Sequence, residues 1–261
     1  MRLLVVGHGR MGRLVASLAP AHGFEIAAVL GREENPGGAA IERGGFGPVD
    51  VAVEFTTPEA VVANVVRLAA RGIPAVVGTT GWRDREAEVR DAVERAGAGI
   101  VVAANFSLGA WVLEAAATAA ASLLAGRAEY GAWLHEQHHA AKRDAPSGTA
   151  LALLDALRRA GYAQAVDVSH TRAGSNPGTH TIGFDGPAES LTFTHAVRDR
   201  AAFAHGALAA ARWIVGRRGW FTMRDVLGLP APPGPPGPGR AGARGQGPGP
   251  EQGRAGKEQE P

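Results

Sequence analysis

Residues 3–12 read LLVVGHGRMG, and this stretch decides the fold of the chain. The apolar run Leu3–Val6 predicts a buried strand, and the glycines after it form the pattern G-x-G-x-x-G. Residues 13–20 predict a helix, and Phe24–Leu30 predicts a second strand. In dinucleotide-binding proteins this order places the pyrophosphate over the glycine turn and the helix N-terminus. We therefore predict a dinucleotide-binding domain here, the alternative being a chance glycine turn.

Strands continue to alternate with helices along the next part of the chain. The three further predicted strands are Val49–Phe55, Ile73–Val77 and Gly99–Ala104. Such alternation predicts an α/β fold with a Rossmann-like, doubly wound parallel sheet. Ligands of these sheets lie outside the carboxyl ends of the strands. We therefore expect Gly78–Gly81 and Ala103–Phe106 to meet the glycine turn at one cofactor, although ordinary turn chemistry is the alternative for both.

The end of the second strand bears on which cofactor is used. NAD-preferring sites usually place an acidic residue there, bonded to the ribose hydroxyls. Here Leu30 is followed by Gly31, which has no carboxylate, and by Arg32, which could pair with a 2′-phosphate. Glu33 and Glu34 are alternative ribose partners, and Arg32 could equally be an ordinary surface arginine. We predict that the chain uses NADPH or NADH and prefers NADPH.

The densest chemistry lies in residues 136–150, which read EQHHAAKRDAPSGTA. The two adjacent histidines titrate near neutral pH, and Lys142 is a cation that suits a carboxylate. A helix that begins near Pro146 or Ser147 would point its first free N–H groups, from about Gly148 and Thr149, at an anion. We therefore predict an anion-binding helix start beside an acid/base pair. The alternative is a polar loop with solvated histidines.

The region after the first sheet is predicted to form a second, α+β domain with a mixed or antiparallel sheet. A long alanine-rich helix at Leu108–Leu124 leads into it. Alternating strands at Thr179–Phe184 and Ser190–Val197 are typical of antiparallel pairing. The resulting division assigns residues 1–107, completed by 217–230, to dinucleotide binding, and residues 108–216 to substrate binding, catalysis and oligomerisation.

Composition narrows the function classes. The 261 residues carry a formal net charge of only +2 and show no concentrated basic face, so nucleic acid is an unexpected partner. The absence of cysteine excludes disulfides and thiolate metal sites, and we expect no metal. No apolar run is long enough for a membrane span, and we expect a cytoplasmic protein. Residues 231–261 are rich in Pro and Gly and are predicted to be disordered.

The motifs together resemble one family, the 4-hydroxy-tetrahydrodipicolinate reductases, also called dihydrodipicolinate reductases. The run from Glu136 to Ala150 carries most of this resemblance and is highly specific to the family. Further matches extend it over residues 2–229, namely Gly78–Gly81, Ala103–Phe106, Arg172-Ala173-Gly174, Gly178-Thr179-His180 and Arg200 with Phe203 and Gly206.

The resemblance implies an oxidoreductase of diaminopimelate and lysine biosynthesis, in which NAD(P)H delivers hydride to a cyclic imine and water is lost. His138 falls on the family's proton donor/acceptor, and Lys142 falls on its second proton donor. His139 falls on a substrate contact, whereas Gly148 and Thr149 fall on the pair that binds a substrate carboxylate. The resemblance also implies a homotetramer built through the second domain's sheet.

The family's cofactor contacts fall on four parts of this chain. They are Gly7, His8, Gly9, Arg10, Met11, Gly12, Arg32, Gly78, Thr79, Thr80, Ala103, Ala104, Asn105 and Phe106. Two rival interpretations remain from the residues alone. Another two-domain dehydrogenase, acting on aspartate or homoserine, would explain the first domain but not the histidine–lysine run. A dinucleotide-binding sensor without turnover gives no reason for the proton-transfer groups.

Overall fold

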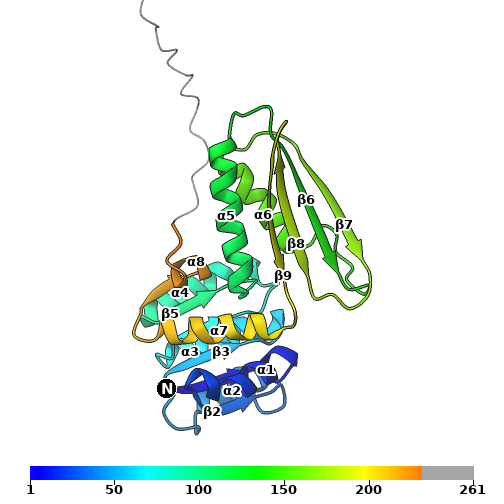
Figure 1. Cartoon of the computed structure of the whole chain (residues 1–261). Helices are drawn as coiled ribbons and strands as arrows, with labels where there is room; N and C mark the ends of the chain where they lie inside the picture. Colours follow the sequence, from blue (N-terminus) through cyan, green and yellow to red (C-terminus); the bar gives the residue numbers. More distant parts are fainter. Residues whose placement is uncertain (231–261) are drawn as a thin grey trace, which may run out of the picture.

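The computed structural model describes residues 1–230, so the predicted disorder of residues 231–261 concerns a segment outside the described residues. The described chain contains a six-stranded sheet and a four-stranded sheet, and the smaller sheet stands beside one end of the larger (Figure 1). The long helix α5 (Leu108–Leu124) connects the two and has the bounds expected from the sequence. Within residues 1–230 no helix is both long and apolar enough to cross a membrane.

The larger sheet is entirely parallel, with strand order β10-β5-β4-β3-β1-β2. Its strands are β1 (Arg2–Val6), β2 (Glu25–Leu30), β3 (Val51–Glu54), β4 (Ala75–Val77), β5 (Gly99–Val102) and β10 (Gly219–Phe221). Leu3 and Val5 pack into one core and Leu4 and Val6 into another, because successive side chains point to opposite faces. Burial on both faces is why this strand reads as a continuous apolar run.

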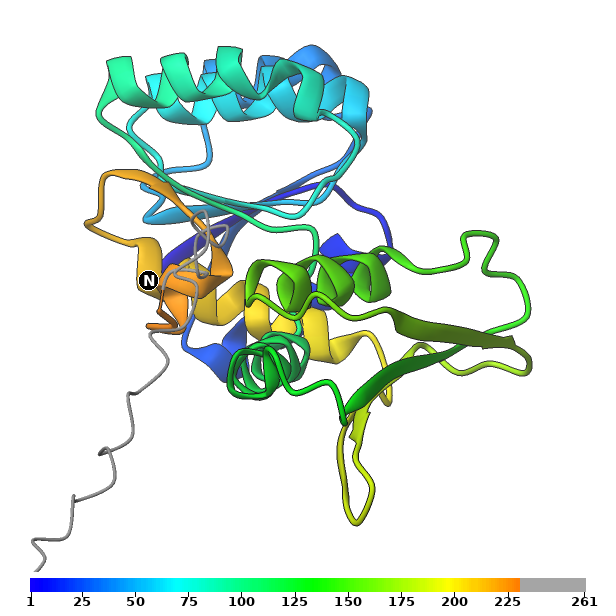
Figure 2. The same cartoon turned by 90° about the horizontal axis from the view of Figure 1, so that it is seen from above.

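Helices cover both faces of the parallel sheet, which confirms the doubly wound fold (Figure 2). One face carries α2 (Ala39–Arg43), α3 (Pro58–Ala70) and α4 (Glu86–Ala96). The other face carries α1 (Arg10–Leu18), α7 (Ala201–Ile214) and α8 (Met223–Val226). Short 3₁₀ turns lie at Pro20–His22, Pro36–Gly38 and Arg83–Arg85. The second face therefore depends on helices that come from the end of the described chain.

The smaller sheet is mixed, with strand order β7-β6-β8-β9, as the sequence pattern predicted. Its strands are β6 (Gly131–His138), β7 (Val166–Arg172), β8 (Thr179–Asp185) and β9 (Ser190–Ala196). The central strand β6 pairs parallel with β7 and antiparallel with β8. Helices α5 and α6 (Gly148–Arg159) pack on one face through a core that includes Leu134, Leu153 and Ile182.

Three element boundaries differ from the sequence expectation in ways that matter for the site. The sequence pattern predicts strands over Glu129–Gln137 and Val166–Ser169, whereas β6 continues to His138 and β7 continues to Arg172. The register of these strands places His138 opposite Arg172. Residues 219–221, for which no strand was predicted, form an edge strand of the parallel sheet beside β5.

Candidate active site

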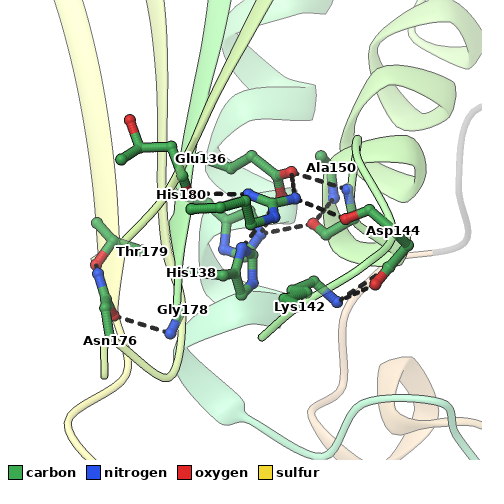
Figure 3. A network of polar contacts seen from close by, with 12 residues as sticks. Glu136, His138, Lys142, Asp144, Ala150, Asn176, Gly178, Thr179 and His180 are labelled. Atoms are coloured by element: carbon green, nitrogen blue, oxygen red, sulfur yellow. Dashed lines mark hydrogen bonds and ion pairs between the residues drawn. The ribbon is translucent and has the colours of Figure 1, made fainter. Parts of the chain in front are cut away.

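A fully buried carboxylate, that of Glu136, lies at the centre of the site (Figure 3). Glu136 and His138 are two residues apart on β6, so both point to the face that α6 covers. The Oε1 atom of Glu136 accepts hydrogen bonds from Nη2 of Arg172 at 2.6 Å and from the backbone N–H of Ser147 at 2.9 Å. Burial alone would raise the pKa of Glu136, but these hydrogen bonds hold it below its ordinary value.

His138 lies at the carboxyl end of β6 with its two ring nitrogens in different surroundings. Its Nδ1 faces Oε2 of Glu136 at 3.5 Å. Its Nε2 faces Gly178, where an added Cβ would lie only 3.0 Å away. Burial lowers the pKa of His138, the Glu136 carboxylate acts in the opposite direction, and Lys142 and Arg172 lower it further. Since Nδ1 is directed at the protein, Nε2 is the nitrogen left to meet a ligand.

A second buried histidine, His180, packs edge-on against His138 with 5.1 Å between ring centroids. Its Nε2 lies 3.1 Å from the Ser147 hydroxyl and 3.5 Å from Oε2 of Glu136. Burial, with a further contribution from His138, lowers the pKa of His180 to about 4. His180 is therefore neutral near pH 7, and its Nε2 can accept the Ser147 hydroxyl hydrogen.

Lys142 approaches the site from the loop after β6. Its Nζ donates to both carboxylate oxygens of Asp144, at 2.8 and 2.9 Å, and this bond lowers the pKa of Asp144. Arg172 also donates to the backbone carbonyl of Asp144 at 2.7 Å, which fixes the loop to β7. A carboxylate ligand would meet Lys142 in competition with Asp144.

The N-terminus of α6 faces the same region. Ser147 caps this helix, because its hydroxyl accepts from the N–H of Ala150. The next two residues, Gly148 and Thr149, form the first turn, and an added Cβ on Gly148 would meet no atom within 4 Å. Their N–H groups precede the helical hydrogen bonds and are free for an anion. His139, which follows His138, is half-buried, and its backbone N–H donates to the carbonyl of Asn176 at 2.7 Å.

Glu136, His138 and His180 also meet the geometric requirement for a metal site, since their ligand atoms lie within 4.8 Å of one another. The donor set, however, shares its carboxylate with the Arg172 guanidinium at 2.6 Å. A divalent cation on the same carboxylate would be repelled by that fixed positive charge. The arrangement suits a histidine–carboxylate pair better than a metal.

The glycine turn has the close approaches that a dinucleotide requires. An added Cβ on Gly7 would lie 2.0 Å from the Phe55 carbonyl oxygen, and one on Gly12 would lie 1.8 Å from the Gly7 carbonyl oxygen. Gly9 is different, because an added Cβ there would meet nothing within 4 Å. Helix α1 begins directly after Gly9 and has no side-chain cap. Open space and free N–H groups therefore coincide where a pyrophosphate would lie.

Phe55 joins the three candidate cofactor segments, although no sequence motif predicts a role for it. Besides its contact with Gly7, its ring blocks any side chain at Gly78, where an added Cβ would lie 1.9 Å away. Its ring also packs edge-on against Phe106 at 6.0 Å. The carboxyl ends of β1, β4 and β5 are thus continuous in space, as expected for one ligand site.

A buried polar network lies beneath these segments. Glu54 is fully buried and accepts from the Thr56 hydroxyl, from the Thr79 hydroxyl at 2.6 Å and from Asn64 at 3.2 Å. Burial raises the pKa of Glu54 even though these hydrogen bonds oppose it. Since the Thr79 hydroxyl also accepts from the Thr56 N–H at 2.7 Å, it is committed internally, and Thr79 would meet a cofactor through its backbone.

The loop after β2 places charges of both signs beside the glycine turn. Arg32 is exposed, and its charge lies near the exposed Glu59. Glu34 folds back towards the strand, so an added Cβ on Gly31 would lie 2.5 Å from its Oε2 atom and 3.4 Å from the Cβ of His8. A carboxylate therefore occupies the position that an acidic residue at Gly31 would fill.

The segment Ala103–Phe106 leads directly into α5, and the start of this helix contacts β9 of the smaller sheet. Ser107 caps α5, and its hydroxyl lies 3.3 Å from Nε2 of His195 on β9. His195 is in turn the cross-strand neighbour of His180 on β8. The end of a candidate cofactor segment is thus separated from the buried Glu136 by two histidines.

His138, Lys142, Gly148 and Thr149, which the sequence pattern predicted to form one site, lie at the end of β6, in the loop after it and in the first turn of α6. The sequence pattern assigned no role to three residues that hold the site in place, namely Glu136, Arg172 and His180. The spacing of Glu136 and His138, two residues apart on a strand, is a signal that could have paired them. The partners on β7 and β8 depend on strand register, which the sequence did not supply.

Comparison with known proteins identifies relatives over most of the chain. Residues 1–106 match the family model described as dihydrodipicolinate reductase, N-terminus, and residues 109–227 match the one described as dihydrodipicolinate reductase, C-terminus. A 4-hydroxy-tetrahydrodipicolinate reductase of Christiangramia forsetii is 30% identical over 87% of this chain and 98% of its own length. The reductase of Acidiphilium cryptum is 36% identical over 85% of this chain and 94% of its own.

A solved structure supports the fold. Dipicolinate-bound dihydrodipicolinate reductase from Paenisporosarcina sp. TG-14 aligns with a TM-score of 0.73 at 21% identity, covering 85% of this chain and 97% of the other. The structure named putative myo-inositol dehydrogenase from Sinorhizobium meliloti 1021 aligns with a TM-score of 0.54 at 13% identity, covering 87% of this chain and 93% of the other. The two-sheet architecture is therefore shared with several dehydrogenases.

Proposed function

The chain belongs to the dihydrodipicolinate reductase family, and from this premise we propose that the site around His138 performs the family's reaction. The protein is an oxidoreductase that reduces 4-hydroxy-tetrahydrodipicolinate to tetrahydrodipicolinate with loss of water, in diaminopimelate and lysine biosynthesis. When bound, the nicotinamide cofactor supplies the hydride. The open space over Gly9 and the uncapped start of α1 fit its pyrophosphate.

We assign substrate binding to the two sources of positive potential beside His138. The substrate is a dicarboxylate, and the first N–H groups of α6, from Gly148 and Thr149, suit one carboxylate. Lys142 suits the other carboxylate or acts as a second proton donor, after exchanging its bond to Asp144. His139 contacts the substrate from the adjoining backbone. These roles agree with those that the family resemblance implies.

We assign proton transfer to His138. Addition of hydride to a conjugated imine leaves negative charge that a proton must meet at the neighbouring carbon. The Nε2 atom of His138 is the nitrogen that does not face Glu136, and it would deliver this proton. The observation that carries the assignment is the pairing of His138 with a buried carboxylate beside a free helix N-terminus.

The function is tested by a coupled assay in which the cyclic imine is freshly generated and NADPH oxidation is followed. His138→Gln is expected to lower kcat by about 100-fold or more, with a smaller change in KM, as general acid–base catalysis requires. His205→Gln, a change of an exposed histidine on α7, is the matched control and should keep wild-type turnover. Near wild-type turnover of His138→Gln would remove its proton-donor role.

We propose that both cofactors are used and that Arg32 gives NADPH the advantage. Arg32 can pair with a 2′-phosphate, whereas the Glu34 carboxylate beside Gly31 can accept the ribose hydroxyls of NADH. Arg32→Ala should therefore lower the ratio of kcat/KM for NADPH over NADH, and Glu34→Gln should raise it. These roles would be contradicted if the NADPH/NADH ratio of kcat/KM changed in the same direction in both variants, or if it changed in neither.

We further propose a homotetramer joined through the smaller sheet and a cytoplasmic location, as the family resemblance implies. The face of this sheet away from α5 and α6 has no described helix over it (Figure 1). It carries Thr181 on β8 and Thr194 on the edge strand β9, whose hydroxyls meet at 3.1 Å. Light scattering should report four copies for the wild type and fewer for Thr181→Arg. If the Thr181→Arg protein is still a tetramer, the interface does not lie on this face of the sheet.

A further inference from the structure

Glu136 has no role in the chemistry proposed above, yet it is the charged residue most completely removed from solvent in this site. We propose that Glu136 is a positioning residue, whose carboxylate orients the His138 ring through Nδ1 and favours its protonated form. This inference rests on the proposed role of His138 as proton donor. It goes beyond that role, because it identifies the residue that sets the tautomer and the acidity of His138.

The carboxylate is itself held in place, which a positioning group requires. Oε1 receives two hydrogen bonds, from Arg172 and from the N–H of Ser147, and so cannot turn towards His138. Oε2 receives no hydrogen bond within the described residues and is fully buried. Buried Nδ1 of His138 also has no hydrogen-bond partner there and faces Oε2 at 3.5 Å. When Nδ1 of His138 carries the hydrogen, it is the donor that Oε2 of Glu136 lacks, and Oε2 is the acceptor that Nδ1 lacks.

The other imidazole at this carboxylate does not compete for the proton. His180 presents Nε2 to the Ser147 hydroxyl, and that hydroxyl accepts from the N–H of Ala150, so its hydrogen is directed at His180. With a pKa near 4, His180 stays neutral when His138 is charged. Of the two imidazoles at this carboxylate, only that of His138 therefore pairs with Glu136 in its charged form.

The four charged groups around His138 are divided in their effect on its protonation. Lys142 and Arg172 oppose it, whereas Glu136 and Asp144 favour it. Burial and the cations lower its pKa, and the carboxylates raise it. The titratable and charged groups that face it are Glu136, Lys142, Asp144, Arg172 and His180. Asp144 is exposed and paired with Lys142, which leaves Glu136 as the principal group that keeps His138 able to hold a proton.

The orientation effect has a steric counterpart on the other side of the ring. Gly178 has a φ of 154°, and its backbone lies so near Nε2 of His138 that an added Cβ would be 3.0 Å away. Glu136 and Gly178 thus hold the ring from opposite edges, with Nδ1 towards the carboxylate. A ring turned by 180° would lose the acceptor for its Nδ1–H and present the wrong nitrogen to the substrate.

The test is Glu136→Gln, which keeps the volume and the acceptor for Arg172 and Ser147 but removes the charge. The pKa of His138 is measured directly by NMR titration of its ring protons, and its tautomer is measured by ring-nitrogen shifts. We expect the pKa to fall by about one unit or more, since a nearby opposite charge shifts a pKa by about 1–3 units. In the pH dependence of kcat, the limb that reports the protonation of His138 should move to lower pH by the same amount. The value of kcat should fall, and the KM for NADPH should stay unchanged.

The matched control is Glu189→Gln, which changes a glutamate of the β8–β9 loop that bonds Tyr130 away from the site. A Glu136→Gln protein that is folded, as judged by circular dichroism and a cooperative thermal transition, and keeps the wild-type His138 titration would overturn the inference. Failure of His138→Gln to lower turnover would instead remove the proton-donor role while leaving the NMR titration as an independent test of the coupling. Arg172→Lys, which keeps a cation near Glu136, should shift the His138 titration less than Glu136→Gln.

Discussion

At the scale of single residues, two glycines of one turn are glycine for different reasons. Gly12→Ala would force a methyl group to 1.8 Å from the Gly7 carbonyl oxygen, and such overpacking costs about 1–3 kcal/mol. Gly9→Ala meets no atom within 4 Å and has an ordinary φ of −79°. We expect Gly12→Ala to lower the Tm by several degrees, and Gly9→Ala to keep the Tm but raise the Kd for NADPH. Thermal unfolding and cofactor titration measure the two effects, and the opposite pattern would contradict the proposed cofactor site.

The low pKa of His180 predicts a pH dependence of stability. In the unfolded chain this histidine binds a proton near pH 6.5, but in the folded protein it does so only near pH 4. The free energy of unfolding should therefore fall as the pH drops from about 6.5 towards 4, by an amount on the order of 3 kcal/mol for this residue.

Urea unfolding of the wild type and of His180→Asn at pH 7 and pH 4.5 measures this contribution. The variant should lose less stability than the wild type between the two pH values, because it has no proton to take up on unfolding. Equal losses in wild type and His180→Asn would mean that His180 is not neutral in the folded protein.

Residue chemistry was readable from the sequence only where the groups are close along the chain. His138, Lys142, Gly148 and Thr149 fall within twelve consecutive residues, so their coincidence was visible without a fold. Glu136 needed the strand assignment of β6 to be paired with His138. Arg172 and His180 needed the register of β7 and β8 against β6, which is set by packing across the sheet rather than by local pattern.

At the scale of elements, the start of α6 is stabilised by a serine that also contacts a histidine. Ser147→Ala removes the cap, which costs about 1 kcal/mol, and removes the hydrogen-bond partner of His180. We expect a lower Tm, by about 2–4 °C, and a raised KM for the substrate, since the first-turn N–H groups lose their fixed direction.

Thr222→Ala provides a matched cap deletion, because Thr222 caps α8 away from the site. It should lower the Tm without changing the KM for the substrate. A comparable rise in KM from both variants would show that general destabilisation, rather than the geometry of α6, causes the effect.

Most elements were predictable, because apolar strands and capped helices carry local signals. Helix α5 was expected with its observed bounds. A threonine followed by a proline is typical of a helix start, and Thr57 with Pro58 does begin α3, although the Thr57 hydroxyl makes no capping bond. The ends of β6 and β7 were not predictable. Their last residues are polar, and they are strand only because the neighbouring strand supplies hydrogen bonds and because Glu136 and Arg172 neutralise one another.

At the scale of the whole molecule, the first domain depends on the last described elements. Helix α7 covers the face formed by Val5, Val53, Val76 and Val101, and β10 pairs with the edge of β5. We expect a fragment of residues 1–107 to lack a cooperative unfolding transition and to bind a hydrophobic dye, because this apolar face would be exposed to water. Residues 1–230 should unfold cooperatively. A stable 1–107 fragment would show that α7 is dispensable.

The same connectivity has a consequence during protein synthesis. The ribosome completes β5 at residue 102 but does not complete β10 until residue 221. At about 5–20 residues per second, the apolar face awaiting α7 and β10 stays uncovered for roughly 6–24 s. During that interval the nascent sheet has an open edge beside β5 and a bare apolar surface, both of which favour association with other chains. The chain is therefore more prone to association between the completion of β5 and the completion of β10 than it is once folded.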